Sequence, residues 1–152
     1  MEIEREIDQV YNSLEDPQPH TAEQVKAIRN LIKLNLVTFI YRQYDETRKL
    51  ISPNYKQHNY EAGDGPESII EFTNYFYEKC EKTGNQVKLE PRIKRILVDG
   101  DYIVIHTHLL RWNGDRGMNI MDIYRYKDGQ FLEHWDLLGE VPEHCKNANG
   151  VF

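Results

Sequence analysis

The sequence predicts an α+β domain in which helices cover a curved antiparallel sheet. Up to about Glu81 the apolar residues recur at helical spacing, and from Val87 onward they alternate instead. Asp-Gly pairs at 99–100 and 128–129 predict hairpin turns between antiparallel strands. Helices followed by a run of strands are typical of α+β proteins. At 152 residues the chain fits one domain and can enclose a pocket as well as a core.

The predicted helices begin with a short amphipathic arm, residues 1–20, which ends where Asp16-Pro17-Gln18-Pro19 forbids its continuation. Residues 21–152 then form the main α+β domain. Thr21-Ala-Glu-Gln24 has the form of a capping box and predicts a long amphipathic helix up to about Tyr44. Residues 45–50 fit a further short helical turn.

The middle of the chain alternates between extended and helical segments. Tyr55–Asn59 has the pattern of extended chain, and Gly63-Asp-Gly-Pro66 is typical of a loop that enters a helix. That helix is expected from Glu67 to about Glu81. Four strands should follow as a meander, at residues 87–98, 102–112, 117–126 and 130–138.

Asp122 is the most promising functional residue, because alternation places it on an apolar strand face with Met118, Ile120, Tyr124 and Tyr126. An ionised carboxylate among apolar side chains is unfavourable by several kcal/mol unless it is paired, so such a group usually has a raised pKa or a hydrogen-bonding partner. A general acid or base is tuned in this way. The alternative is a structural aspartate that backbone amides or solvent satisfy.

In two of the predicted strands the sequence pattern does not decide which side chains face the core. In residues 102–112 both faces look buried, which suggests that a second subunit covers the outer face and that the protein is a homodimer through its sheet. In residues 130–138 hydrophobicity alone predicts that Trp135 faces the core and that His134 and Asp136 face outward.

Metal and thiol chemistry find little support in the sequence. The chain is rich in histidines that could meet these aspartates in the fold, namely His58, His106, His108 and His134. No spacing among them is specific for a metal, so we expect hydrogen-bonded histidines of a pocket or core instead. Cys80 and Cys145 lie far apart without a ligand spacing and are expected as free thiols. We therefore expect no metal and no cofactor.

Charge and hydropathy limit the partners. The net charge is -6 and no lysine or arginine cluster occurs, which argues against nucleic acid or an anionic membrane as the main partner. The first residues show no signal-peptide pattern and nowhere do about 18 apolar residues run together, so we expect a cytoplasmic protein. A small molecule or another protein remains as the partner.

The sequence resembles the SnoaL-like polyketide cyclase family of the nuclear transport factor 2-like superfamily. The resemblance runs from about Ala22 to the C-terminus, and its segments are Tyr55–Asn59, Ala62–Gly65, Gly100–His108, Gly114–Gly117, Met121–Arg125, Asp128–Asp136 and Ala148–Phe152. It implies a cone-shaped barrel, in which a curved sheet wraps around a long helix and encloses an internal pocket. It also implies that His134, Asp136 and Leu138 face the pocket, contrary to the outward facing of His134 and Asp136 that hydrophobicity alone predicts.

The resemblance further implies cofactor-independent acid–base catalysis on a small enolisable carbonyl compound, by an aldol-type cyclase, isomerase or dehydratase. Met121–Arg125 resembles the segment of ketosteroid isomerase whose aspartic acid is kept neutral by an apolar site. Either Asp122 or Asp136 would move the proton, and His108, His58 and His134 would stabilise the enolate oxygen. Further ligand-binding residues are expected at Asn59, His106 and Leu138. A non-catalytic small-molecule binding protein and a homodimeric interaction module of this fold are the alternatives.

Overall fold

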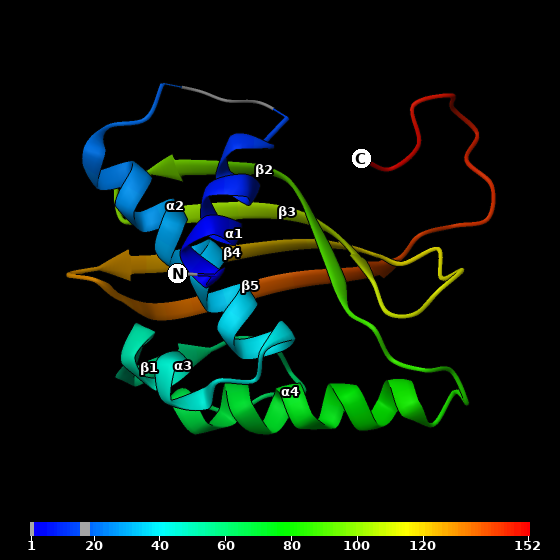
Figure 1. The fold of residues 1–152 in the computed structure, drawn as a ribbon, viewed down its shortest axis with the longest axis horizontal. Coiled ribbons are helices and arrows are strands. Elements are labelled where there is room, and N and C mark those ends of the chain that lie inside the picture. The colour runs from blue at the N-terminus through cyan, green and yellow to red at the C-terminus, as the bar shows by residue number, and fades with distance from the viewer. Residues whose placement is uncertain (1, 16–18) are drawn as a thin grey trace.

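The computed structural model describes residues 2–15 and 19–152 and confirms the α+β order of elements (Figure 1). The helices are α1 (Glu2–Asn12), α2 (Ala22–Asn35), the π-helical turn η1 (Leu36–Ile40), α3 (Tyr44–Leu50) and α4 (Pro66–Glu81). The strands are β1 (Ile51–Gln57), β2 (Glu90–Asp99), β3 (Tyr102–Leu110), β4 (Met118–Lys127) and β5 (Gln130–Glu140). Figure 1 shows α1 and α2 in front of the sheet and α4 running along the edge where β1 lies.

The sheet contains the predicted meander and one further strand. Its order in the described residues is β1-β5-β4-β3-β2, and β2 to β5 pair antiparallel in sequence order. The segment expected only as extended chain supplies β1, which pairs parallel with β5 and makes the sheet mixed. Both predicted Asp-Gly turns connect neighbouring strands, and Gly100, Asp128 and Gly129 have the positive φ angles that such turns need.

A β-bulge in β5 sets which side chains face the helices. Tyr126 of β4 pairs with Phe131, but the next residue back, Arg125, pairs with Glu133. Leu132 is therefore an extra residue, which changes the alternation along β5. As a result Phe131 and His134 point to the same, inner face of the sheet, where each lies against the ring of Tyr124.

The core lies between α2 and the inner face of the sheet. Ile28, Leu31 and Ile32 of α2 are fully buried, as are Ile105 and Phe131 on the strands, and each such side chain contributes about 1.5–3 kcal/mol by its burial. The arm also belongs to this core, because Ile7 of α1 is only 2% exposed. The predicted break at residues 16–19 lies, except for Pro19, outside the described residues.

Helix α2 begins and ends differently. Thr21 and Gln24 form the predicted capping box. The expected helix to about Tyr44 ends its α-helical part at Asn35 and continues as η1, where the Tyr41 amide donates to the Leu36 carbonyl. This wider turn releases the carbonyl of Phe39, which accepts a hydrogen bond from the Tyr77 hydroxyl at 2.7 Å.

The outer face of the sheet is covered in part by the C-terminal tail. Phe152 packs against the rings of His108 and His106, with centroids 4.3 and 5.6 Å apart, and Asn119 donates to the Val151 carbonyl. Exposed apolar side chains remain on this face, among them Leu137, Leu97 and Ile123. No helix in the described part of the chain is long and apolar enough to cross a membrane. Cys80 and Cys145 are free, as predicted.

Candidate functional site

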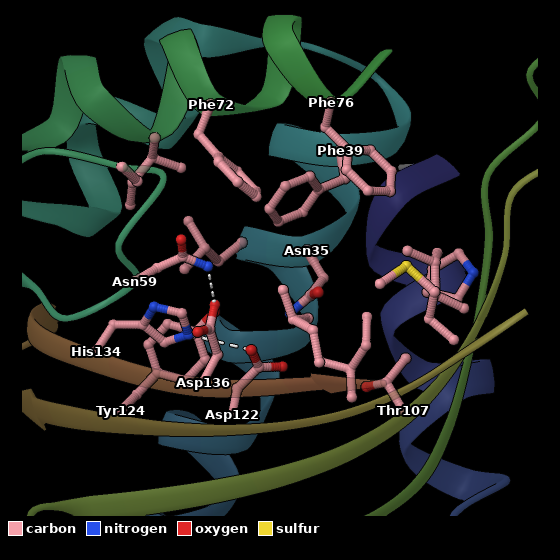
Figure 2. Close-up of a pocket in the computed structure, with 18 of the residues that line it drawn as sticks. Asn35, Phe39, Asn59, Phe72, Phe76, Thr107, Asp122, Tyr124, His134 and Asp136 are labelled. Carbon is pink, nitrogen blue, oxygen red and sulfur yellow. Dashed lines mark hydrogen bonds and ion pairs between the residues drawn. The ribbon is translucent and has the colours of Figure 1, made fainter. Parts of the chain in front are cut away.

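A pocket lies between the inner face of β4 and β5 on one side and α4 and η1 on the other (Figure 2). The free space between its walls, including the opening to solvent, is about 960 Å³. Figure 2 shows Phe72 and Phe76 extending from α4, with Phe39 beside them, opposite a group of polar side chains on the strands. The pocket is therefore mostly apolar, and its acidic residues lie together at one end of its floor.

Asp122 of β4 and Asp136 of β5 form that polar floor. They are directly paired across the two strands, so their side chains project from the same face, at the spacing of about 5 Å that such pairs have between Cβ atoms. Both line the pocket. The resemblance placed His134, Asp136 and Leu138 in the pocket, and all three are found there.

His134 lies against Asp122. Its Nε2 is 3.1 Å from Asp122 Oδ1, and its Nδ1 is 2.9 Å from Gln57 Oε1. The ring stacks on Tyr124, with centroids 4.4 Å apart, and only 6% of the residue is exposed. Both nitrogens of this buried ring are therefore occupied by partners within the protein.

Asn59, which follows β1, holds Asp136. Its Nδ2 donates to Asp136 Oδ2 at 2.6 Å, and its own Oδ1 accepts the Glu61 amide at 2.7 Å. Asn59 is 5% exposed and lines the pocket. The two acids thus have different partners, a histidine for Asp122 and an amide for Asp136.

Burial changes the acidity of the groups at this end of the pocket. Burial raises the pKa of Asp122 above its ordinary 3.8, and the neighbouring Asp136 charge raises it further, while the hydrogen bond and charge of His134 oppose this shift. Burial also raises the pKa of Tyr55 and Tyr124 well above 10.0, and the nearby aspartates add to the effect. Both phenols therefore remain neutral, and Asp122 favours its protonated form more than an exposed aspartate does.

The same groups have the composition of a metal site. Asp122, His134 and Asp136 each offer a ligand atom, and these atoms lie within 4.8 Å of one another. One divalent metal could be held by two carboxylates and an imidazole. The spacing alone does not select a metal, because the same atoms already hydrogen-bond to one another or to Gln57 and Asn59.

Three predicted site histidines lie away from the pocket. His108 was expected to stabilise an enolate oxygen, but it does not line the pocket: Ile105 is opposite Asp122, whereas His108 is opposite Asn119 and contacts the Arg116 carbonyl. His106 is on the same outer face.

His106 and His58 have partners of their own outside the pocket. His106 lies 2.7 Å from both Arg95 and Asn119. His58 stacks on Trp135 with centroids 4.7 Å apart and pairs with Glu133. Neither ring is among the side chains that line the pocket in the described structure. The alternation of side chains explains the positions of His58, His106 and His108, because each is next to a residue that faces the pocket side and so faces the opposite way.

Several pocket residues were not singled out by the sequence. Tyr55 and Gln57 line the pocket together with Asn59, which the sequence had singled out, while the residues between them face away. The alternation within Tyr55–Asn59 could have found Gln57 and excluded His58. Thr107 was also missed: it lines the pocket, is 4% exposed, and its hydroxyl has no hydrogen-bond partner among the described residues.

Comparison with solved structures supports the fold. The structure is similar to a candidate polyketide cyclase from Bacillus cereus, with a TM-score of 0.63, 17% identity, and coverage of 81% of this chain and 80% of that one. A candidate SnoaL-like polyketide cyclase from Jannaschia sp. gives a TM-score of 0.60 and 19% identity over 80% of this chain and 91% of that one. A candidate ketosteroid isomerase from Kribbella flavida gives a TM-score of 0.55 and 16% identity over 78% of this chain and 82% of that one.

The chain has the fold of the SnoaL-like proteins. This confirms the α+β architecture that the sequence resemblance implied, but in the described residues the sheet is open, with β1 and β2 at its edges, and does not close into a barrel. No protein-family model and no curated protein matches the sequence. At identities below 20% these structures establish the architecture, and the chemistry has to be argued from the residues in the pocket.

Proposed function

We propose that this protein is a cofactor-independent enzyme that uses carboxylate and histidine side chains for acid–base catalysis on a small enolisable carbonyl compound. The observation that carries this proposal is the pair Asp122 and Asp136, which lie side by side at the floor of an apolar pocket but have unlike partners. Two carboxyl groups whose environments separate their acidities can act as acid and base in one reaction.

Asp136 is the proposed base. Its Oδ2 is held by Asn59, and Asn59 is itself fixed by the Glu61 amide, so the carboxylate is oriented before a ligand arrives. The other oxygen of Asp136 is the one available to a ligand in the pocket. An oriented carboxylate within hydrogen-bond distance of an acidic C–H group meets the geometric requirement for a general base.

Asp122 and His134 are the proposed acid. Burial favours a protonated Asp122, and the 3.1 Å contact to His134 gives the pair a proton that a ligand oxygen could share. A neutral donor in an apolar site stabilises an oxyanion more strongly than the same group in water, because solvent does not screen the interaction.

The proposed reaction balances with these groups alone. Asp136 takes a proton from the carbon next to a carbonyl, the C–H electron pair moves into an enolate, and the proton shared by Asp122 and His134 turns from that contact to the enolate oxygen. The proton on Asp136 then returns to another carbon in an isomerase. In an aldol-type cyclase the enolate carbon attacks a second carbonyl of the same molecule, and the alkoxide that forms takes the proton back from Asp136. A dehydratase would instead expel a neighbouring hydroxyl as water with the same proton.

Deuterium exchange tests this proposal. Enolisable ketones with steroid-like or polyketide-like skeletons are first screened for binding by thermal shift, and bound ligands are then followed by proton NMR in D2O. We expect exchange at the activated carbon to fall by about 10²–10⁴-fold in Asp136→Asn. Asp101→Asn, an exposed acid in the β2–β3 hairpin, is the matched control.

The enzyme proposal fails if exchange on a bound ligand persists undiminished in both Asp136→Asn and Asp122→Asn. Binding without any exchange in the wild type would leave a non-catalytic binding protein with the same pocket. The measurement therefore separates the two functions directly.

We also propose that the outer face of the sheet pairs with a second copy of the chain. Leu137 is 77% exposed and Leu97 is 50% exposed, and exposed apolar groups on one sheet face favour self-association. Light scattering after size exclusion should give a dimer that Leu137→Asp converts to a monomer. A monomeric wild type at tens of micromolar would contradict this assembly.

A further inference from the structure

The segment that follows β1 fixes two side-chain amides by backbone hydrogen bonds. The Asn59 and His58 amides lie 3.0 and 2.9 Å from one atom of the Gln57 side chain. Because a backbone N–H can only donate, that atom must be the carbonyl oxygen Oε1. By the same reasoning the Glu61 amide, at 2.7 Å, identifies Oδ1 of Asn59 and leaves its Nδ2 facing Asp136. Neither amide can be flipped without losing these bonds.

The orientation of Gln57 decides the tautomer of His134. The Nδ1 atom of His134 lies 2.9 Å from Gln57 Oε1, which is an acceptor, so Nδ1 must carry a proton. In a neutral ring the other nitrogen, Nε2, then has a bare lone pair. That lone pair lies 3.1 Å from Asp122 Oδ1, and an ionised Asp122 beside it would place two acceptors in contact.

One proton must therefore lie between His134 and Asp122. It is either on Asp122, beside a neutral ring, or on Nε2, beside a carboxylate. Both arrangements give the pair the same total charge of zero. The burial of Asp122 favours the first arrangement, although the conclusion needs only the hydrogen-bond geometry.

The orientation of Asn59 has the opposite effect on Asp136. Its Nδ2 donates to Asp136 Oδ2 at 2.6 Å, so the lone pair of Oδ2 that faces Asn59 carries no proton. An ionised carboxylate accepts this bond more strongly than a carboxylic acid does, so the bond favours the ionised form of Asp136. The two amides thus treat the two acids differently.

We propose that Gln57 and Asn59 are positioning residues that set where the protons of this site lie: one shared by Asp122 and His134, and none on the Asp136 Oδ2 lone pair that faces Asn59. This inference rests on the proposed function for its catalytic meaning, and it explains how two paired aspartates take unlike roles. The site is prepared with one base and one donor before a ligand binds.

The surroundings of the site do not supply another proton carrier. Tyr55 and Tyr124 are the other titratable groups that line the pocket in the described structure, and both stay neutral. None of the described side chains lining it is a lysine, arginine or glutamate. On the loop side, Asp64 accepts the backbone N–H of Gln57 at 2.8 Å and so faces the main chain of this segment.

NMR of protein labelled with ¹⁵N in its histidines tests the first half of the proposal without any ligand. Two-bond correlations in the imidazole ring distinguish an Nδ1–H ring, an Nε2–H ring and a doubly protonated ring, and His134→Asn assigns the signal among the six histidines. We expect Nδ1 of His134 to be protonated in the wild type. A neutral ring protonated at Nε2 alone would overturn the proposal.

Gln57→Leu removes the acceptor, and the ring should then change to the Nε2–H tautomer, which can donate to an ionised Asp122. Gln57→Glu keeps an acceptor and should keep the Nδ1 proton. Gln130→Leu, at the start of β5, is the matched control for loss of a glutamine side chain. An Nδ1–H signal unchanged in Gln57→Leu would contradict the role of Gln57. If that variant does not fold, the wild-type tautomer still decides the question.

Asn59→Asp tests the second half. The new carboxylate still accepts the Glu61 amide, but it faces Asp136 with an acceptor where the amide donated, so the two acids must share a proton. We expect the deuterium-exchange rate at neutral pH to fall and its rise with pH to move to higher pH. Asn85→Asp adds the same charge in the exposed loop after α4 and should leave the profile unchanged. Coinciding profiles for Asn59→Asp and the wild type would overturn the role of Asn59.

The outcomes separate this inference from the proposed function. A wild type with the Nδ1–H ring but no exchange on any bound ligand would refute the enzyme and leave the proton arrangement intact. Exchange that depends on Asp136, together with an Nε2–H ring, would support the enzyme and refute the role of Gln57.

Discussion

Histidines lie on both faces of the sheet, but their surroundings differ. On the inner face, His134 is buried between Tyr124, Asp122 and Gln57, and the two polar atoms that its ring nitrogens contact belong to residues that line the pocket. On the outer face, His108 packs on Phe152 and contacts a backbone carbonyl. The surroundings of a histidine in this sheet therefore depend on the face it occupies: His134 lies beside a buried acid, whereas His108 lies beside an aromatic ring of the C-terminal tail.

The first prediction concerns the stability of the two faces. Phe131, fully buried between Tyr124 and Tyr126, should lose about 3–5 kcal/mol of unfolding free energy on change to Ala. Trp135→Ala on the outer face should lose less, because its ring is only partly buried. Urea unfolding measures both, and equal losses would mean that the outer face is covered as fully as the core.

The second prediction compares two histidines in catalysis. His134→Asn should lower the deuterium-exchange rate by about 10²-fold, the lower end of the usual contribution of a proton-transfer group. His108→Asn, the matched change on the other face, should leave the rate unchanged. A larger effect at His108 would show that the active groups lie on the outer face and that the assigned pocket is not the site.

The third prediction uses the hydroxyl of Thr107, which is buried without a partner among the described residues. Thr107→Val keeps the shape and removes the hydroxyl, so the unfolding free energy should rise by about 1 kcal/mol. Thr107→Ser keeps the hydroxyl and is the control. If Val also weakens the binding of a ligand with a second oxygen atom, the hydroxyl serves the ligand; a destabilised Val variant would mean that Thr107 already has a partner.

The fourth prediction is a pH dependence of stability. Because burial raises the pKa of Asp122, the folded protein holds this proton more tightly than the unfolded chain does. Its contribution to stability is therefore complete below pH 3.8 and is lost as the pH rises through the folded-state pKa. Asp122→Asn cannot ionise, so its stability relative to the wild type should increase from acidic to neutral pH. Urea midpoints for the two proteins that move in parallel with pH would show that Asp122 ionises freely.

Local sequence patterns predicted the elements well because each pattern has a local cause. The capping box at Thr21, the Asp-Gly turns and the alternation through 117–126 depend on residues within a few positions of one another. The inward facing of Asp122 followed from this alternation. The inward facing of His134 and Asp136 did not, because the bulge at Leu132 shifts the parity of β5 and a bulge has no signature in this sequence.

The sequence by itself determined an α+β chain, a four-strand meander and an acid on an apolar strand face. Only the tertiary structure decided that β1 joins β5 and so brings Gln57 and Asn59 to His134 and Asp136. The physical reason is distance along the chain. Hydrogen bonds between residues more than seventy positions apart leave no periodic trace, yet these bonds place Asn59 against Asp136 and Gln57 against His134.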